Sequence, residues 1–266
     1  MIKVTVVGAA GRMGRRFVEN IINSDDLELH GALEIDSCPL IGEDAAAVAC
    51  GKNCGVAIAP ASAGLPEGTE AVITFATGGV IETARSAAAM GASIVIGTTA
   101  LPKETTDELA QLAKSGARIV QSGNMSVGVN LLVNLVKKTT AILGEDCDIE
   151  VIEMHHNQKK DAPSGTAAML AKAVLDTKEW SEEVITHGRN GVIGARPRKE
   201  IGMHSLRGGD VVGDHTVMFA MNGERIELTH KASSRDMFSN GALRAVRFLA
   251  GAAPGLYDMQ DVLNLK

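Results

Sequence analysis

Residues 2–14, with the sequence IKVTVVGAAGRMG, decide the fold of this chain. The run 2–7 is rich in β-branched residues, which favours a buried strand, and residues 12–23 repeat apolar side chains with helical spacing. Two glycines, at positions 8 and 11, lie between the strand and the helix, and a third, at position 14, lies in the first turn of the helix. In a dinucleotide-binding unit such glycines allow a sharp turn, let the backbone approach a pyrophosphate and permit close helix packing. The segment therefore predicts the start of a βαβ unit of Rossmann type.

The glycine spacing departs from the standard pattern, because it reads GxxGxxG rather than GxGxxG. Glu34 strengthens the interpretation: it follows Gly14 by 20 residues and ends a second expected strand at 27–33. An acidic side chain at that place accepts hydrogen bonds from the adenosine ribose. The alternative is a glycine turn in an unrelated α/β protein. The cofactor-binding candidates here are Gly8, Ala9, Ala10, Gly11, Arg12, Met13 and Glu34.

Strands and helices continue to alternate through the first half of the chain. Short apolar strands are expected at 71–75, 93–96 and 118–120, with helices at 79–90 and 103–115. This alternation predicts a doubly wound parallel sheet with helices on both faces.

Two turns directly follow expected strands, where the ligand crevice of an open parallel sheet lies. Each turn alone is better explained as an ordinary loop, but their joint placement favours a role in cofactor binding. These candidates are Gly97, Thr98 and Thr99 in one turn and Ser122, Gly123, Asn124 and Met125 in the other.

The second half has a different pattern. The elements expected there are helices at 129–143 and 166–175 and strands at 149–153, 211–219 and 224–230. The last two strands alternate and are joined by Asn222-Gly223, a strong hairpin signal. We expect a second α+β domain with a mostly antiparallel sheet.

The resulting domain prediction has three parts. Residues 1–126 form a dinucleotide-binding domain, and residues 127–235 form a domain for substrate binding and oligomerisation. Residues 236–266, with a helix expected at 238–250, return to the first domain.

Composition excludes several classes of protein. With 26 basic and 32 acidic residues the net charge is -6, so the basic surface of a nucleic-acid binder is not expected. No apolar run is long enough to cross a membrane, and residues 1–7 are too short for a signal peptide. The four cysteines follow no zinc spacing, and we expect reduced thiols in a cytoplasmic protein without a metal site.

Residues 153–166, EMHHNQKKDAPSGT, carry the candidate chemistry of the second domain. A histidine exchanges protons near neutral pH, and a lysine supplies an ammonium group. The amides that open a helix after Pro163 form a carboxylate site. Any one of these residues alone is better explained as a solvated loop residue, but the cluster suits a small anionic substrate that must be protonated. Metal binding by adjacent histidines is disfavoured, because neighbours on an extended strand point to opposite faces.

These motifs together resemble the 4-hydroxy-tetrahydrodipicolinate reductase (dihydrodipicolinate reductase) family. The similarity covers the glycine turn, the histidine-rich segment 153–166 and the later segments 207–216 (RGGDVVGDHT) and 229–235 (THKASSR). The resemblance spans essentially the whole chain. It implies reduction of a small dicarboxylate in lysine and diaminopimelate synthesis, with NADH or NADPH as cofactor, by a homotetramer.

The resemblance also implies roles for single residues. His155 corresponds to the proton donor or acceptor and Lys159 to the general acid. His156, Gly165 and Thr166 correspond to the residues that bind the substrate carboxylates.

Cofactor preference depends on the end of the second strand. A carboxylate at Glu34 repels the 2′-phosphate of NADPH, and Ile35 and Asp36 follow it instead of a basic residue. We therefore expect NADH to be used at least as well as NADPH.

Other functions remain open from the residues alone. A different Rossmann-type dehydrogenase would keep the glycine turn but has no need for the histidine–lysine cluster. An aspartate-semialdehyde dehydrogenase needs an activated cysteine, and Cys147 has no nearby histidine in the sequence. A nucleotide-sensing regulator would need a DNA-binding or partner-binding module, which the sequence does not show.

Overall fold

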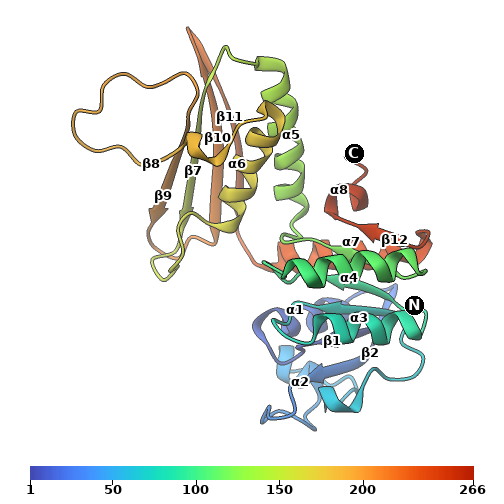
Figure 1. Ribbon diagram of the computed structural model, residues 1–266. Coiled ribbons are helices and arrows are strands. Elements are labelled where there is room, and N and C mark those ends of the chain that lie inside the picture. The colour runs from blue at the N-terminus through green and yellow to red at the C-terminus, as the bar shows by residue number, and fades with distance from the viewer. The chain divides into compact units, whose positions relative to one another are not determined.

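The computed structural model describes residues 1–266 and contains a seven-stranded parallel sheet, six strands of which come from the first 121 residues (Figure 1). The strand order is β12-β6-β5-β4-β1-β2-β3. The strands are β1 (Ile2–Val7), β2 (Leu27–Glu34), β3 (Ile58–Pro60), β4 (Ala71–Thr74), β5 (Ser93–Ile96), β6 (Arg118–Gln121) and β12 (Gly255–Tyr257). Strand order reverses between β1 and β4, and the carboxyl ends of all strands share one edge.

The strands of this sheet carry apolar side chains on both faces, and helices therefore pack against both faces. Every residue of β4 and β5 is buried, as expected for central parallel strands. Helices α3 (Val80–Ala89) and α4 (Lys103–Lys114) pack with the strands in one apolar cluster. Helices α1 (Arg12–Ile22) and α7 (Asp236–Gly251) contact each other and lie against the strands on the other face.

The chain folds into two compact units. Unit 1 comprises Met1–Ser126 and Asp236–Lys266, and unit 2 comprises Val127–Arg235. The C-terminal segment joins unit 1 through α7 and through β12, which pairs in parallel with β6. A short helix, α8 (Met259–Val262), follows β12.

Unit 2 is built on a five-stranded sheet of order β11-β10-β7-β9-β8. The strands are β7 (Asp148–His155), β8 (Ile185–His187), β9 (Ile201–Arg207), β10 (Gly213–Met221) and β11 (Glu224–Ala232). Helices α5 (Val127–Leu143) and α6 (Gly165–Lys178) cover one face of the sheet (Figure 1). The β10–β11 hairpin turns at Asn222-Gly223, where Gly223 has φ 90°.

The second sheet is mixed. β7 pairs antiparallel with β10, as the hairpin pattern led us to expect, but it pairs in parallel with β9, which in turn pairs in parallel with β8. Strands β8 and β9 were not expected from the sequence, because β8 has three residues and β9 contains Gly202, which interrupts alternation.

Several expected bounds shift for identifiable reasons. The strand expected at 211–219 begins at Gly213, because Val211 instead accepts a hydrogen bond from the His156 amide. Helix α2 (Ala45–Cys50) was not expected and has only six residues. The Asp44 carboxylate caps it by accepting from the Ala46 and Ala47 amides.

A long connection joins β8 to β9, as Figure 1 shows. An ion-pair network fixes it. Arg189 donates to both Glu150 and Glu200, and Arg196 donates to Glu150 at 3.0 Å. These arginines offset the burial of Glu150 and hold the pKa of its carboxyl at about 2, with His204 as a further donor. No helix is both long and apolar enough to cross a membrane.

Candidate active site

The glycine turn of unit 1 is closed by backbone hydrogen bonds. The Gly8 and Ala9 amides donate to the Leu33 carbonyl at 2.8 and 3.0 Å, which fastens the turn to β2. Gly8 has φ 81°, a left-handed conformation that favours glycine. Gly11 begins α1 without a side-chain cap, so the first amides of this helix face the turn, where an anion is favoured.

Gly14 permits the close approach of α1 to the turn. A Cβ atom at this position would lie 2.0 Å from the Gly8 carbonyl oxygen and 2.7 Å from the Ala9 backbone. No larger residue fits without a backbone shift. The third glycine of the motif is therefore required by packing.

Glu34 lies at the carboxyl end of β2, as the sequence indicates, and already binds the turn. Its carboxylate accepts hydrogen bonds from the Ala10 amide and the Ile35 amide, each at 3.0 Å. Asp36 accepts from the Ser62 amide at 3.0 Å, and its hydrogen bonds with Ser62 lower the pKa of its carboxyl. Ile35 between them is 63% exposed.

The other cofactor-binding candidates of unit 1 lie in turns that follow β5 and β6. The Gly97 amide donates to the carbonyl of Thr74, the last residue of β4, and the Thr98 hydroxyl donates to the Ala76 carbonyl at 2.7 Å. Thr98 is buried, whereas Thr99 is exposed. A Cβ atom at Gly97 would lie 2.1 Å from the ring of Phe75, so glycine is required here too.

The turn after β6 is ordered by its own polar groups. The Ser122 amide donates to the Ile96 carbonyl, and its hydroxyl donates to the Asn124 carbonyl at 2.9 Å. The Asn124 side chain accepts from the Ser126 amide at 2.9 Å. Met125 is buried and lies against Gly241 of α7, while Gly123 is exposed.

The turn after β4 was not predicted as part of the site. This turn lies at the strand-order reversal, where ligands of such sheets bind, and Ala76 comes within 3.9 Å of a Cβ built on Gly8. The sequence carried the same signal as for the other two turns, because this turn directly follows a strand that was predicted at 71–75. The Phe75 ring also packs against the Phe17 ring of α1 in a tilted arrangement, with ring centroids 4.8 Å apart.

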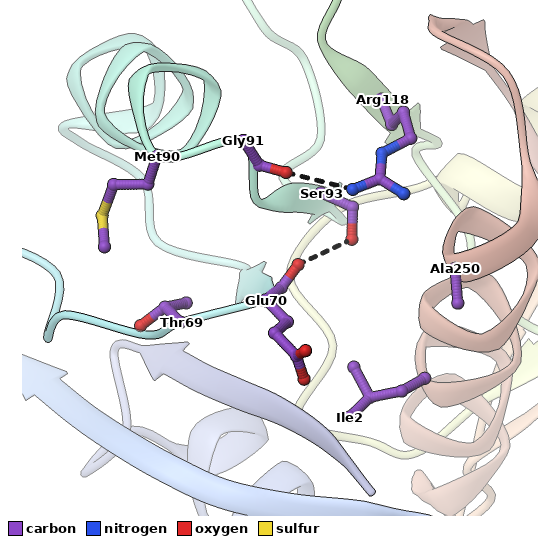
Figure 2. Close-up of a pocket in the computed structure, with 8 residues that line it drawn as sticks. All are labelled: Ile2, Thr69, Glu70, Met90, Gly91, Ser93, Arg118 and Ala250. Atoms are coloured by element: carbon purple, nitrogen blue, oxygen red, sulfur yellow. Dashed lines mark hydrogen bonds between the residues drawn. The ribbon is translucent and has the colours of Figure 1, made fainter.

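A cavity of about 300 Å³ lies at the opposite edge of this sheet (Figure 2). Its walls include Ile2, Ser93 and Arg118, which begin β1, β5 and β6. The Arg118 guanidinium donates to the carbonyls of Leu249 and Gly91, at the ends of α7 and α3. Arg118 thus satisfies helix carbonyls, and the cavity lies away from the glycine turn.

Strand β7 sorts the residues of the histidine-rich segment by alternation. Its buried face includes Val151, Glu153 and His155, whereas Met154 points the other way. His156 begins the loop after the strand, its amide bound to Val211, and is half-buried. The two adjacent histidines therefore differ in place: His155 lies on the buried face of β7, and His156 lies in the loop after it.

The Glu153 carboxylate is the centre of the site in unit 2. It is 1% exposed and receives two hydrogen bonds from the Arg207 guanidinium, both at 2.9 Å. It also accepts from the Ser164 amide at 3.2 Å and lies 2.5 Å from Nδ1 of His155. Burial alone raises the pKa of Glu153, but hydrogen bonds from Arg207 and then His155 bring it down to about 2. The carboxylate is charged at neutral pH.

His215 of β10 lies beneath the start of α6. Its Nε2 is 3.0 Å from the Ser164 hydroxyl, which caps α6 by accepting from the Ala167 amide. The His155 and His215 rings meet edge to face, with centroids 5.1 Å apart. Burial, then the charge on His155, lowers the pKa of His215 to about 4, so His215 is neutral at pH 7.

Lys159 lies in the loop after β7 and is paired. Its ammonium donates to both oxygens of Asp161, at 3.0 and 2.9 Å, and the pair lowers the pKa of Asp161. The Lys159 side chain is 19% exposed, whereas Lys160 is an exposed residue. The Asp161 carbonyl accepts from Arg207 at 2.7 Å, which ties this loop to the Glu153 centre.

At the start of α6, Gly165 is exposed and Thr166 is half-buried. Unit 2 thus gathers every predicted site residue of the histidine-rich segment around β7 and the first turn of α6. It adds three side chains for which the sequence predicted no role: Glu153, Arg207 and His215. Arg207 and His215 lie in segments that resemble the family, but their partners are more than 50 residues away in the chain.

The two units define a class. A parallel sheet with a glycine turn at its strand-order reversal is typical of dinucleotide-binding proteins, and in this chain a second unit with a mixed sheet accompanies it. GenD2 from gentamicin A biosynthesis, solved in complex with NAD, shares this fold with a TM-score of 0.59 at 15% identity, covering 99% of this chain and 90% of its own.

Sequence comparison identifies the family. Residues 2–125 match the family described as dihydrodipicolinate reductase, N-terminus, and residues 128–263 match its C-terminal counterpart. The chain belongs to the dihydrodipicolinate reductase family.

Individual relatives align with this chain over essentially their full lengths. The 4-hydroxy-tetrahydrodipicolinate reductases of Roseobacter denitrificans and Syntrophotalea carbinolica are 47% and 45% identical, each covering 100% of this chain. The alignments cover 98% and 100% of those proteins. A dipicolinate-bound dihydrodipicolinate reductase from Paenisporosarcina sp. TG-14 has the same fold, with a TM-score of 0.75, 23% identity and 98% coverage of both chains.

Proposed function

We propose that this protein reduces 4-hydroxy-tetrahydrodipicolinate, by way of dihydrodipicolinate, to tetrahydrodipicolinate in lysine and diaminopimelate synthesis, using NADH or NADPH. The observation that carries the proposal is the set of His155, Lys159 and the α6 start around one buried carboxylate, in a chain that matches the family from end to end. A competing dehydrogenase of another family has no use for this set.

The residues of unit 2 supply protons and charge in this proposal. The 4-hydroxy substrate loses water, the resulting conjugated imine receives hydride at ring carbon 4, and the developing enamine is protonated. His155 and Lys159 are the proton-transfer groups, because both are titratable and lie on the same loop end of β7. His156, Gly165 and Thr166 bind the carboxylates, and the amides at the α6 start favour negative charge.

The residues of unit 1 fit a dinucleotide. The nicotinamide cofactor supplies the hydride. The glycine turn from Gly8 to Met13 and the uncapped start of α1 suit a pyrophosphate, and Glu34 suits a ribose. The turns at 97–99 and 122–125 end neighbouring strands at the same sheet edge, which favours contact with the remainder of the cofactor.

Turnover is the first test. The purified protein is mixed with enzymatically generated 4-hydroxy-tetrahydrodipicolinate, and oxidation of NADH is followed by absorbance. Oxidation that depends on the dicarboxylate supports the proposal, and its absence with both cofactors contradicts it. Thermal-shift measurements with dipicolinate, a planar dicarboxylate, test binding separately.

Lys159→Met tests the charge of the substrate site. Deleting the ammonium removes a charge-assisted contact, so kcat/KM for the dicarboxylate should fall by about tenfold or more. The neighbouring Lys160→Met is the matched control and should change kcat/KM by less than about threefold, because Lys160 is exposed. Equal effects of the two substitutions would mean that Lys159 is only a loop cation.

We also propose a homotetramer assembled through the sheet face of unit 2 that α5 and α6 leave uncovered. This face carries half-buried apolar side chains, among them Ile152 and Met154, and the 50% exposed Leu206. Light scattering should report four copies, and Leu206→Glu should reduce that number. We place the reaction in the cytoplasm, in keeping with four free cysteines.

A further inference from the structure

The buried Glu153 carboxylate contacts both the proton donor and the start of α6. We propose that Glu153 is a positioning residue for the reduction: it holds the proton of His155 on Nδ1, so that Nε2 is the nitrogen that exchanges protons, and it ties the ring to the carboxylate site at the α6 start. The inference rests on the proposed function and adds to it the residue that orients the proton donor.

Geometry gives one carboxylate two tasks. One oxygen, Oε2, lies 2.5 Å from Nδ1 of His155, and the other, Oε1, accepts from the Ser164 amide that opens α6. The proton donor and the carboxylate site are therefore fixed relative to each other through a single side chain. A displacement of Glu153 would move both.

Arg207 keeps this carboxylate in the form that the task needs. A carboxylate can only accept hydrogen bonds, so His155 must donate its Nδ1 proton to it. The bidentate contact with Arg207 stabilises the anion and fixes its plane. Arg207 is itself held by the Asp161 carbonyl.

The other edge of the His155 ring is kept open. A Cβ atom at Gly213 would lie 3.0 Å from Nε2, so glycine at this position leaves room beside that nitrogen. With the proton fixed on Nδ1, the neutral ring presents a lone pair at Nε2 and the charged ring presents a second proton there.

Neighbouring charges are consistent with this assignment. The groups that face His155 and Glu153 are Arg207 of β9, His215 of β10 and Lys159 of the loop after β7, with His230 of β11 beyond His215. Burial lowers the pKa of both His215 and His230. Glu153 therefore supplies the negative charge beside the His155 ring without competition from a charged His215.

The first experiment reads the tautomer directly and needs no turnover. The protein is labelled with ¹⁵N-histidine, and the His155 ring signals are identified by their loss in His155→Gln. In the neutral ring we expect a protonated Nδ1 and an unprotonated Nε2. A proton on Nε2 would overturn the inference, even if the enzyme turns over normally.

The second experiment uses Glu153→Gln, which keeps the side-chain shape. Loss of the anionic partner should lower kcat by about 10–100-fold, the range found when the hydrogen-bond partner that orients a metal-bound histidine is removed. It should also move the limb of the kcat–pH profile that reports the proton donor to lower pH, because the imidazolium loses its counter-charge. The affinity for NADH should stay unchanged. A lower Tm with an unshifted pH profile would show that Glu153 is only structural.

Controls separate this outcome from misfolding and from failure of the proposed function. Glu179 is exposed and follows the far end of α6 from Ser164, so Glu179→Gln makes the same exchange away from His155 and should leave kcat and its pH profile near those of the native protein. If Glu153→Gln alone does not fold, the double variant E153Q/R207M removes the unpaired guanidinium. If the native protein shows no turnover, the proposed function fails, while the ring-nitrogen signals still decide the role of Glu153.

Discussion

The glycine turn of unit 1 and the histidine-rich segment of unit 2 are held in place by different interactions. Backbone hydrogen bonds and the absence of side chains shape the first, as the contacts of Gly8 and Gly14 show. Ion pairs and hydrogen bonds between side chains shape the second, with Glu153 and Arg207 at the centre. The turn depends on local sequence, and the site in unit 2 depends on residues far apart in the chain.

This difference has consequences for substitution. A change in the turn should act through sterics and be independent of pH. A change around Glu153 should act through charge and proton positions and depend on pH. Kinetics, stability and pH together therefore distinguish the two kinds of site.

His155→Ala should have the largest effect on turnover. General acid–base groups contribute about 10²–10⁴-fold, so kcat should fall by about 100-fold or more. The affinity for NADH, measured by fluorescence titration, should be unchanged, because the glycine turn lies in unit 1. His187→Ala, at an exposed residue of β8, is the control. Near-native turnover of His155→Ala would remove this residue from the mechanism.

His215 gives unit 2 an expected dependence of stability on pH. Its pKa is about 4 in the fold against 6.5 for an unperturbed histidine, so the unfolded chain binds more protons between these values. The contribution of His215 to the free energy of unfolding is therefore fully present above about pH 6.5. It is lost as pH falls toward 4, and the loss is on the order of 3 kcal/mol.

Urea unfolding at several pH values measures this effect. His215→Gln should flatten the free energy of unfolding between pH 6.5 and 4. The loss from Glu153 comes lower, as its pKa is depressed to about 2. Equal slopes for the two proteins would contradict a buried, neutral His215.

The features that the sequence predicts are those set by local sequence, and the features that it misses are those set by residues far apart in the chain. The β1 turn, the position of Glu34 and the strand at 93–96 were predicted because each is encoded in a continuous stretch. The parallel strands β8 and β9 were missed because they are set by tertiary pairing: β9 pairs with β7, and β8 pairs with β9. No role was predicted for Arg207 or His215 for the same reason. The neighbouring sequence does not show that Arg207 contacts Glu153 or that His215 contacts Ser164.

Gly14→Ala tests the steric side of the comparison. Helix propensity alone favours alanine by about 0.5–1 kcal/mol. The added Cβ would lie 2.0 Å from the Gly8 carbonyl oxygen, and such overpacking costs about 1–3 kcal/mol. We expect a lower Tm and weaker NADH binding, with no dependence on pH. Gly251→Ala in α7, where the Cβ meets nothing within 4 Å, is the matched control. An unchanged Tm and NADH affinity would show that the turn adjusts freely.

The smallest expected effect concerns the choice between NADH and NADPH at the end of β2. Of the three arginines near the turn, Arg15 donates to the Ala10 and Val48 carbonyls, and Arg16 pairs with Glu19. Arg12 remains exposed at the start of α1 and could turn toward a phosphate.

The carboxylates at positions 34 and 36 oppose a 2′-phosphate, although Asp36 is exposed and salt screens its charge. We therefore expect kcat/KM for NADH to equal or exceed that for NADPH by a modest factor. Ile35→Arg should shift the ratio toward NADPH by about tenfold, because a guanidinium can bind the phosphate through two hydrogen bonds. Ile35 is 63% exposed and Ile193 of unit 2 is 56% exposed, so Ile193→Arg adds the same charge at a similar exposure and should leave the ratio unchanged. A clear NADPH preference in the native protein would contradict the assignment of Glu34 to the ribose. No shift in Ile35→Arg would place the 2′ position elsewhere on unit 1.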